Sequence, residues 1–415
     1  MLQLQRRIAA CILATVLLPT VAVQAATYYV ATTGNDSNNG TSENTPFATP
    51  RKGIEILQAG DTVLIKNGTY NITNYIWLTR GGSASAPIKI MAYPGHVPVL
   101  NFLDTTDNRK YYRLLLQRTP GHNLPIGYVT VEGLTFTNGV NAIRWYNCDH
   151  CTIRRNRIVA PYGSGILGTG GLDNLIDRNV IENAGDTSDH GLYLTGSRYV
   201  ITNNLIYGSE KYGIQLNGTA NPNDTRNYAG PEFAKTENVI ITNNVVAYNR
   251  TAAAIVIWGP WVNNARIENN IFYQNGLDAG TFNGINWVAC CSTGVQIRNN
   301  ISYATEPRST VFMSSRPTEN VHYTQSGNMV NTVDPGFVNA PAIMPALPNF
   351  KLKERSSAID QGLLPERSPG LPLATTRIDF NGTTRPQGRA YDIGAYEYSA
   401  GNDSESPAAP ILQVR

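Results

Sequence analysis

Three short segments of the chain place an imidazole, phenols, amides and a guanidinium group at matching positions. Each segment runs from a polar residue, through a small residue and an aliphatic one, to a second polar residue: Asn141 to Arg144, His190 to Tyr193, and Tyr212 to Gln215. Such groups can together neutralise the charge of a carboxylate, take up a carbon-bound proton and donate a proton to a leaving oxygen. The segments therefore predict acid–base chemistry on a substrate that carries a carboxylate.

Five residues are candidates for the groups that move protons. His190 is the predicted base, and Lys211 is the alternative base. The hydroxyl group of Tyr193 or of Tyr212 is the predicted proton donor. Asp189 directly precedes His190 and would orient its imidazole or tune its charge. A structural interpretation competes with these roles, because an Asp-His pair before a glycine also closes turns and a lysine beside a strand is often only a solvated edge residue.

A second group of residues is predicted to contact the substrate. Arg144, with Gln215 or Asn217, is the candidate for holding the carboxylate. The predicted substrate contacts are amides and aromatic rings: Gln215, Asn217, Trp258, Tyr146 and Asn286. Aromatic rings offer flat apolar faces for stacking on substrate rings. A structural role for Arg144, and a plain surface position for the tyrosines, are the competing interpretations.

The elements that must position these residues repeat along the chain. The pattern aliphatic-x-x-Asn-x-aliphatic recurs with its asparagine at 156, 179, 204, 244, 270 and 300, and each unit follows a Gly/Ala-Ile/Leu motif such as Gly191-Leu192. Alternation within these short strands puts the aliphatic residues inside and the residues between them outside. Stacked asparagines can hydrogen-bond from one coil to the next. We predict an all-β, single-stranded, right-handed parallel β-helix; a leucine-rich repeat would need a longer leucine frame.

A solenoid must also close its ends, because terminal coils expose apolar core and strand edges. Thr49 and Pro50 open a short predicted helix through Leu57, followed by a strand from Thr62 to Lys66. The predicted division is 1–25 signal peptide, 26–105 N-terminal cap and first coils, 106–330 β-helix repeats, 331–398 C-terminal coils and cap, and 399–415 flexible tail. The residues between Asn217 and Thr236 form a predicted insertion that could wall a cleft.

Composition narrows the classes of partner. The 415 residues are only 15% charged, against roughly 25% in an average domain. Arg6 and Arg7, an apolar run and Val23-Gln24-Ala25 are typical of an export signal cleaved after Ala25, which predicts a secreted or periplasmic protein. Removal of this segment leaves 31 basic against 30 acidic residues. Nucleic acid is therefore a poor candidate partner, and no later stretch has the ~20 apolar residues of a membrane span.

The remaining cysteines form two separate pairs in the sequence. Cys148 and Cys151 are three residues apart, and we predict a disulfide between them in an oxidising compartment. Cys290 and Cys291 are adjacent and either form a vicinal disulfide or remain thiols. A shared zinc site would need both pairs close together, whereas the repeat separates them by about five coils of ~4.8 Å.

Motifs at both ends of the chain resemble those of a known superfamily. They are Tyr28-Tyr29-Val30, Gly34-Asn35-Asp36, Pro46-Phe47, Gly60-Asp61-Thr62-Val63, Gly68-Thr69-Tyr70, Ala92-Tyr93-Pro94-Gly95 and Asp392-Ile393-Gly394-Ala395-Tyr396. In these residues the chain resembles secreted right-handed parallel β-helix proteins of the pectate-lyase-like superfamily, of the polysaccharide lyase and C5-epimerase type. The resemblance implies an acidic polysaccharide as partner and specifies the fold more strongly than the chemistry.

The resemblance leaves several functions open. A polysaccharide lyase acting on a uronate polymer by β-elimination is the leading hypothesis. The alternatives are a C5-epimerase, which shares the first step, a glycoside hydrolase, and a non-catalytic glycan-binding protein. A hydrolase needs two carboxylates, for which Asp186, Asp224 and Glu232 near Asp189 are candidates. Calcium, which related lyases bind with clustered aspartates, stays an alternative cofactor, although no Asp-Gly-x-Asp run is present.

Overall fold

The computed structural model describes residues 24–103, 114–118, 125–186, 189–218, 236–276, 283–288, 292–305, 312, 322–364 and 376–400. These residues form short β-strands and one short α-helix, α1 (Pro50–Glu55). In these ranges there is no helix long and apolar enough to cross a membrane. Residues 1–23 of the predicted export signal lie outside the described residues, as do Asp224, Glu232, Cys290, Cys291 and most of the predicted insertion after Asn217.

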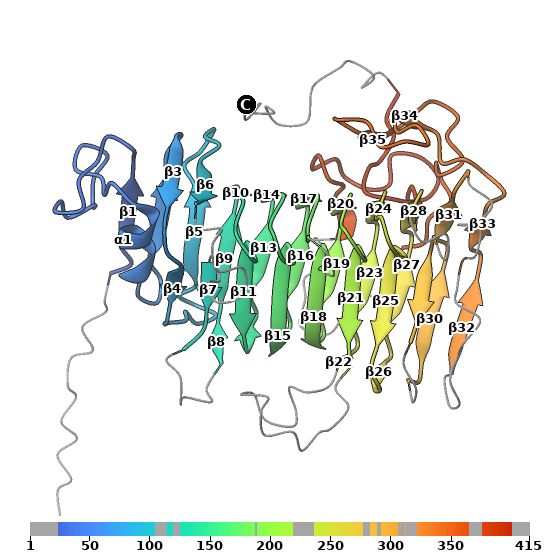
Figure 1. The fold of residues 1–415 in the computed structure, drawn as a ribbon, viewed down its shortest axis with the longest axis horizontal. Helices are drawn as coiled ribbons and strands as arrows, with labels where there is room; N and C mark the ends of the chain where they lie inside the picture. Colours follow the sequence, from blue (N-terminus) through green and yellow to red (C-terminus); the bar gives the residue numbers. More distant parts are fainter. Residues whose placement is uncertain are drawn as a thin grey trace, which may run out of the picture.

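Three long parallel sheets build the molecule (Figure 1). The first sheet contains, in spatial order, β1 (Thr27–Val30), β2 (Thr62–Ile65), β5 (Ile88–Ala92), β9 (Val129–Glu132), β13 (Thr152–Arg154), β16 (Leu175–Asp177), β19 (Val200–Thr202), β23 (Ile240–Thr242), β27 (Arg266–Glu268), β30 (Val295–Arg298) and β32 (Tyr323–Ser326). The second contains β3 (Thr69–Ile72), β6 (Val99–Phe102), β10 (Thr135–Thr137), β14 (Arg157–Val159), β17 (Val180–Glu182), β20 (Leu205–Tyr207), β24 (Val245–Ala247), β28 (Ile271–Tyr273), β31 (Ile301–Tyr303) and β33 (Met329–Val330).

The third sheet carries the candidate site. It contains β4 (Ile76–Leu78), β7 (Leu114–Leu116), β11 (Ile143–Tyr146), β15 (Ile166–Leu172), β18 (Leu192–Ser197), β21 (Ile214–Asn217), β25 (Ile255–Trp258) and β29 (Ile285–Trp287). Small sheets join β8 (Ile126–Gly127) to β12 (Cys148–Asp149), β22 (Thr236–Glu237) to β26 (Val262–Asn263), and the antiparallel β34 (Phe337–Asn339) to β35 (Asn349–Leu352). In the central coils the chain passes from the third sheet to the first, then the second, and back, which is the predicted right-handed parallel β-helix.

Aliphatic residues in exact register fill the interior of the coils. One inward row on the first sheet consists of Ile153, Ile176, Ile201, Ile241, Ile267 and Ile297, which pair in consecutive strands and are buried. β-Branched side chains suit a pleated surface that is packed on one face, so the repeated isoleucines favour short strands at these positions. The predicted inward and outward alternation is confirmed.

The repeated asparagines form a ladder inside the turn between the first and second sheets. The side-chain amide of Asn156 donates to Oδ1 of Asn179 at 3.1 Å, and the same contact continues through every following coil at 2.9–3.0 Å to Asn328. Residues directly before the ladder, such as Asn203 and Asn243, have φ near +54°. Asparagine tolerates this left-handed backbone, so one residue type serves both the turn and the ladder.

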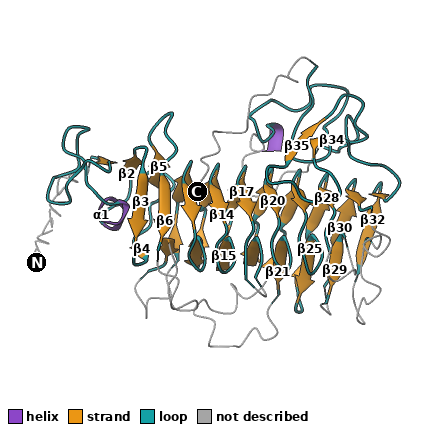
Figure 2. Ribbon diagram, turned by 45° about the horizontal axis from the view of Figure 1, so that its top comes forward, coloured by secondary structure: helices purple, strands orange, loops and turns teal. Residues whose placement is uncertain are grey.

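The N-terminal end is closed by α1, as Figure 2 shows. The Thr49 side chain accepts a hydrogen bond from the backbone N–H of Lys52 at 3.2 Å, and Pro50 occupies the first helical position. The helix ends at Glu55, two residues earlier than predicted. Its Gly53 lies so close to Val30 and Val63 that a Cβ atom there would clash with both side chains. The small residue therefore lets the helix cover the start of the first sheet.

The C-terminal segment packs along the flank of the coils rather than only around their end (Figure 1). Phe337, Phe350 and Ile393 join a buried cluster with outward residues of β20, β24 and β28, such as Leu205 and Tyr273. Those strands are buried on both faces. Because their outward residues are apolar, they must be covered, which explains why the segment predicted as C-terminal coils and cap lies over the second sheet.

Candidate active site

The outer face of the third sheet gathers the candidate residues in rows that follow the stack. One outward row, read coil by coil, is Leu115, Arg144, Leu167, Tyr193, Gln215, Val256 and Asn286. A second row contains Tyr146, Thr169 and Thr195 on neighbouring coils and Asn217 paired with Trp258 further along. Residues in one row lie ~4.8 Å apart per coil because neighbouring strands are hydrogen-bonded. All eleven predicted catalytic and binding residues therefore lie on this face or at its edge.

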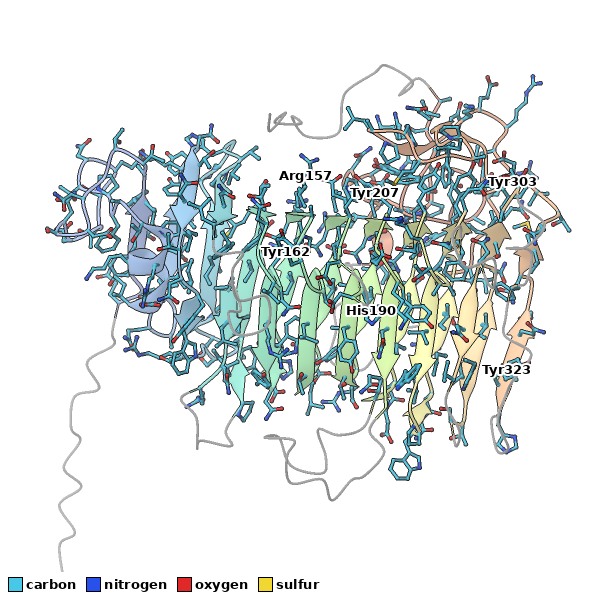
Figure 3. All side chains as sticks on the ribbon, viewed as in Figure 1. Arg157, Tyr162, His190, Tyr207, Tyr303 and Tyr323 are labelled. Carbon is cyan, nitrogen blue, oxygen red and sulfur yellow. A yellow bond between two sulfur atoms is a disulfide. The ribbon has the colours of Figure 1, made fainter. Side chains whose placement is uncertain are left out.

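His190 lies at the edge of this face, just before β18, and is 6% exposed (Figure 3). Its ring stacks on that of Tyr193, with centroids 5.7 Å apart and planes at 12°, and lies 5.4 Å from the ring of Tyr212. Nδ1 accepts a hydrogen bond from the backbone N–H of Tyr212 at 3.4 Å. The proton of the neutral ring is therefore on Nε2, which makes Nε2 a donor.

The surroundings keep the His190 imidazole neutral. Burial, with a smaller contribution from the charge of Lys211, lowers the pKa of His190 to about 3. A ring with this pKa holds a proton too weakly to act as an efficient base near neutral pH. The predicted role of base for His190 thus conflicts with both its pKa and its tautomer.

The two tyrosines beside His190 differ in exposure and in partner. Tyr193 is half-buried, and burial raises the pKa of its phenol while the charge of Arg144 opposes that rise. Tyr212 is 5% exposed and packs against Val256, and its hydroxyl group accepts a hydrogen bond from Nδ2 of Asn286 at 2.8 Å. Burial raises the pKa of Tyr212 as well. Tyr193 is therefore the phenol with more access to a substrate.

Arg144 is held in place by an aromatic neighbour two residues along β11. Its guanidinium carbon lies 4.2 Å from the centroid of the Tyr146 ring, and Nη2 donates to the Tyr146 hydroxyl group. An arginine that stacks on an aromatic ring can also bind planar partners such as a carboxylate. This geometry suits the predicted role of Arg144.

Lys211 and Asp189 lie on the same edge of the face. Nζ of Lys211 is 5.9 Å from the centroid of the Tyr212 ring, and its backbone N–H donates to the carbonyl group of Asp189. The Asp189 carboxylate accepts a hydrogen bond from Oγ of Ser164 at 3.5 Å. The hydrogen bond that orients the His190 ring at Nδ1 comes from the Tyr212 backbone, not from Asp189.

Some features of the face were not predicted from the sequence. Trp258 is 44% exposed, as a stacking residue would be, whereas Gln215 is 6% exposed and bonds to Asn217 at 3.5 Å. Tyr162, which follows Pro161 in the turn leading to β15, is 42% exposed (Figure 3) and was missed. The sequence feature that could have predicted an exposed Tyr162 is its position as an aromatic residue directly after a proline in a turn.

Among the described residues, this face has no cluster of calcium ligands. Calcium takes six to eight oxygen ligands, mostly carboxylates and carbonyls. In the described part of the chain no three His, Cys, Asp or Glu side chains gather as a metal site. Asp189 lies beside Lys211 at the edge of this face.

The predicted disulfide is present near this face. Cys148 and Cys151 are bonded, with their Cα atoms 6.0 Å apart. The bond joins Cys148, the first residue of β12, to Cys151, which directly precedes β13, where the chain turns from the third sheet toward the first. It therefore closes a turn in the coil that also carries Arg144.

Comparison with known proteins identifies the architecture. Residues 28–189 match the family described as Pel9A-like, right-handed β-helix region, and residues 123–302 match the family described as right-handed β-helix region. Pectate lyase Pel9A has a similar structure, with a TM-score of 0.56 and 18% identity over 90% of this chain and 96% of that chain. A rhamnogalacturonan lyase has a similar structure as well, with a TM-score of 0.55 and 15% identity over 79% of this chain and 97% of that chain. At these identities the likeness concerns the fold.

Curated relatives match shorter stretches. The uncharacterized protein YwoF of Bacillus subtilis is 26% identical over 220 residues, covering 47% of this chain and 45% of YwoF. Pectate lyase PEL9 of Emericella nidulans is 35% identical over 80 residues, 19% of each chain. Pectate lyase L of Dickeya dadantii is 38% identical over 71 residues, 16% of each. The matches thus span less than half of these relatives, and what the comparisons show is that the chain contains right-handed β-helix regions, the first of them like that of the Pel9A-like family.

Proposed function

We propose that the protein is a polysaccharide lyase that cleaves a uronate-containing polysaccharide by β-elimination on the outer face of the third sheet. The observation that carries the proposal is that partly exposed Tyr193 and Lys211 lie beside the neutral ring of His190, with Arg144 two coils from Tyr193 in the same outward row. These groups supply a cation for a carboxylate, a phenolic proton and an amine. The pectate lyases and the rhamnogalacturonan lyase among the similar proteins support a carbohydrate substrate.

In the proposed reaction Arg144 binds the uronate carboxylate and stabilises the negative charge that develops on it. The amine of Lys211 takes the proton from C5 of the sugar. The electron pair of that C–H bond forms the C4–C5 double bond, and the bond from C4 to the glycosidic oxygen breaks. Tyr193 donates its proton to the leaving oxygen. The products are a new reducing end and an unsaturated uronate.

His190 acts as a positioning residue in this scheme. Its ring stacks on Tyr193, and its Nδ1 is fixed by the Tyr212 backbone. The proposal therefore transfers the role of base from His190 to Lys211. A raised pKa keeps the Tyr193 phenol protonated, as a proton donor requires. We also propose that the protein acts outside the cytoplasm, which the export-signal pattern and the disulfide support.

The first test is elimination by the purified protein. We expect ultraviolet absorbance from unsaturated uronate to rise on at least one member of a panel of pectate, alginate, glucuronan, hyaluronan and rhamnogalacturonan. Arg144→Ala should lower kcat/KM by about 10²–10³-fold, the loss typical of removing a group that stabilises a developing oxyanion, and Arg144→Lys should restore part of it. Arg266→Ala, on the first sheet, is the matched control and should keep full activity.

The same assay, combined with measurements of proton exchange, reducing ends and binding, also distinguishes the three alternative functions. Proton exchange from solvent into the polymer without new absorbance would show the C5-epimerase, which shares the first step. New reducing ends without absorbance would show a hydrolase, for which Asp189 and the nearby Asp186 are the candidate carboxylates among the described residues. Binding with neither reaction would show a glycan-binding protein, and each of these three results would overturn the lyase proposal.

A further inference from the structure

Asp61 is a buried carboxylate at the N-terminal end of the first sheet, directly before β2. It is 3% exposed. Its Oδ1 accepts a hydrogen bond from the backbone N–H of Ala26 at 2.8 Å, and its Oδ2 accepts one from the backbone N–H of Gln58 at 2.8 Å. Both oxygens therefore act as acceptors, as the oxygens of an ionised carboxylate do.

The negative charge of Asp61 has no cationic side chain as its partner in the described ranges. No lysine, arginine or histidine there forms an ion pair with it, and its hydrogen-bond donors are backbone N–H groups. Burial and, to a smaller extent, this charge raise the pKa of the Tyr28 phenol. A buried charge is costly unless an opposite charge lies close to it. The position of the Ala26 nitrogen, at 2.8 Å from Oδ1, is therefore suited to a cation.

That nitrogen belongs to the peptide bond at which the export-signal pattern predicts cleavage. The pattern Val23-Gln24-Ala25 places the cut after Ala25. Gln24 and Ala25 are exposed, whereas Ala26 is half-buried. The carbonyl group of Ala26 accepts a hydrogen bond from the backbone N–H of Thr62 at 2.8 Å, which begins the pairing of β1 with β2. The predicted cut thus lies at the boundary between exposed and anchored backbone.

We propose that hydrolysis of the Ala25–Ala26 peptide bond creates an α-ammonium group on Ala26 that forms an ion pair with Asp61. Water adds across the bond, so Ala25 leaves with a carboxylate and the Ala26 nitrogen becomes an amine. This amine is protonated near neutral pH, since the pKa of a free α-amine is about 7.7–8.0. In the uncut chain the same nitrogen is a neutral amide, so processing adds the charge that Asp61 lacks. The proposal rests on export and is independent of the lyase reaction.

The ion pair would act at the end of the stack, where stability is lowest. β1 is the terminal strand of the first sheet and lies beside α1 (Figure 1). A terminal unit of a solenoid has a neighbour on one side only, so it opens more readily than a central coil. An ion pair at Ala26 should therefore slow the opening of β1.

The first experiment determines where the exported chain begins. The full chain is expressed in a bacterium, and the protein outside the cytoplasm is sequenced from its N-terminus. We expect Ala26 as the first residue. Any other first residue, Met1 included, overturns the proposal.

The second experiment compares two forms of the chain that begins at Ala26, one with a free amine and one acetylated on the Ala26 nitrogen. Acetylation removes the charge but keeps an N–H group that can donate to Asp61. At about pH 6.5 we expect the β1 amides of the acetylated form to exchange about tenfold faster, the factor that corresponds to a rise of one pH unit in the pKa of the amine. Equal exchange rates in the two forms overturn the proposal.

Two variants identify the partner of the amine. Asp61→Asn removes the negative charge and should abolish the difference between the free and acetylated forms. Asp334→Asn, at an exposed carboxylate whose Oδ1 accepts from the backbone N–H of Gly336, is the matched control and should keep the tenfold difference. A difference that persists in a folded Asp61→Asn protein overturns the proposal. If this variant does not fold, the comparison of the two parent forms still decides.

The pH dependence separates an ion pair from a plain hydrogen bond. An amine whose pKa is raised by folding stabilises β1 below about pH 7.7, and this contribution is lost as the pH rises through the raised pKa. The ratio of the two exchange rates should therefore fall toward one above about pH 8, and a constant ratio overturns the proposal. The other titratable side chains on β1, β5 and α1 are the same in both forms, so the ratio isolates the amine: Tyr28, Tyr29, Lys89, Arg51, Lys52 and Glu55.

Discussion

At the residue scale, the informative group is His190, whose environment was not evident from its neighbours in the sequence. Burial and Lys211 lower the pKa of His190 to about 3, so we expect its imidazole to stay neutral from pH 8 to pH 5, where a free imidazole titrates near 6.5. Nuclear magnetic resonance of histidine-labelled protein measures this directly. In Lys211→Met the loss of one positive charge should raise the pKa of His190, while burial keeps it below 6.5.

The lowered pKa of His190 also makes the free energy of unfolding decrease as the pH falls. Because the folded state binds this proton less strongly than the unfolded state, His190 contributes stability above pH 6.5 that is lost as the pH falls toward 3. A His190→Gln variant should therefore show a weaker fall in the free energy of unfolding over that range. Titration of His190 near pH 6.5 in the parent protein would contradict this account and return the role of base to His190.

At the element scale, the asparagine ladder holds the coils together. Asn244 is fully buried, and its amide group donates to the carbonyl groups of Ile201 and Thr242 and to Asn270, while its Oδ1 accepts from Asn204. Asn244→Ala leaves buried groups without partners, so the free energy of unfolding should fall by about 2–5 kcal/mol. Urea titration followed by circular dichroism measures the change.

An exposed inter-coil pair provides the control for the ladder. Asn71 accepts a hydrogen bond from Asn101 at 2.8 Å on the surface of the second sheet. Asn71→Ala should cost less than about 0.5 kcal/mol, because water replaces the lost partner. Equal effects of Asn71→Ala and Asn244→Ala would show that burial of the ladder does not contribute as argued.

At the scale of the whole molecule, a buried arginine of the C-terminal segment forms an ion pair within that segment and a hydrogen bond to the coils. Nη1 of Arg385 lies 2.9 Å from Oε2 of Glu397, both side chains are fully buried, and Nη2 of Arg385 donates to Oδ1 of Asn203 at 3.2 Å. Arg385→Met leaves the Glu397 charge buried without its partner, which costs about 3–5 kcal/mol. We expect faster hydrogen exchange across 376–398, with the central coils still protected, in mass spectrometric measurements.

The neighbouring Arg389 serves as the matched control, because it is exposed in the same segment. Arg389→Met should leave hydrogen exchange unchanged. Unaltered exchange in Arg385→Met would mean that the apolar cluster around Phe350 alone holds the segment in place.

The sequence by itself determined the architecture and the rows of the candidate site. Isoleucine alternation, one asparagine per coil and matching motifs recur within each coil, so they could be aligned without coordinates, and the register of Arg144, Tyr193 and Gln215 on one face follows from that alignment. The Thr49 cap and the Cys148–Cys151 bond are equally local. Such features are predictable because each depends on residues close together in the chain or on a strict repeat.

Only the tertiary structure decided how these residues are surrounded. Tyr212 is hydrogen-bonded to Asn286, which is 74 residues away in the sequence. Tyr212 and Tyr193 enclose the ring of His190, and this burial keeps the imidazole neutral. Likewise, the C-terminal segment covers the second sheet because residues more than 100 positions apart meet there. Burial, pKa and exposure depend on which coils and segments come together in space, and a repeat pattern contains no information about contacts outside the repeat.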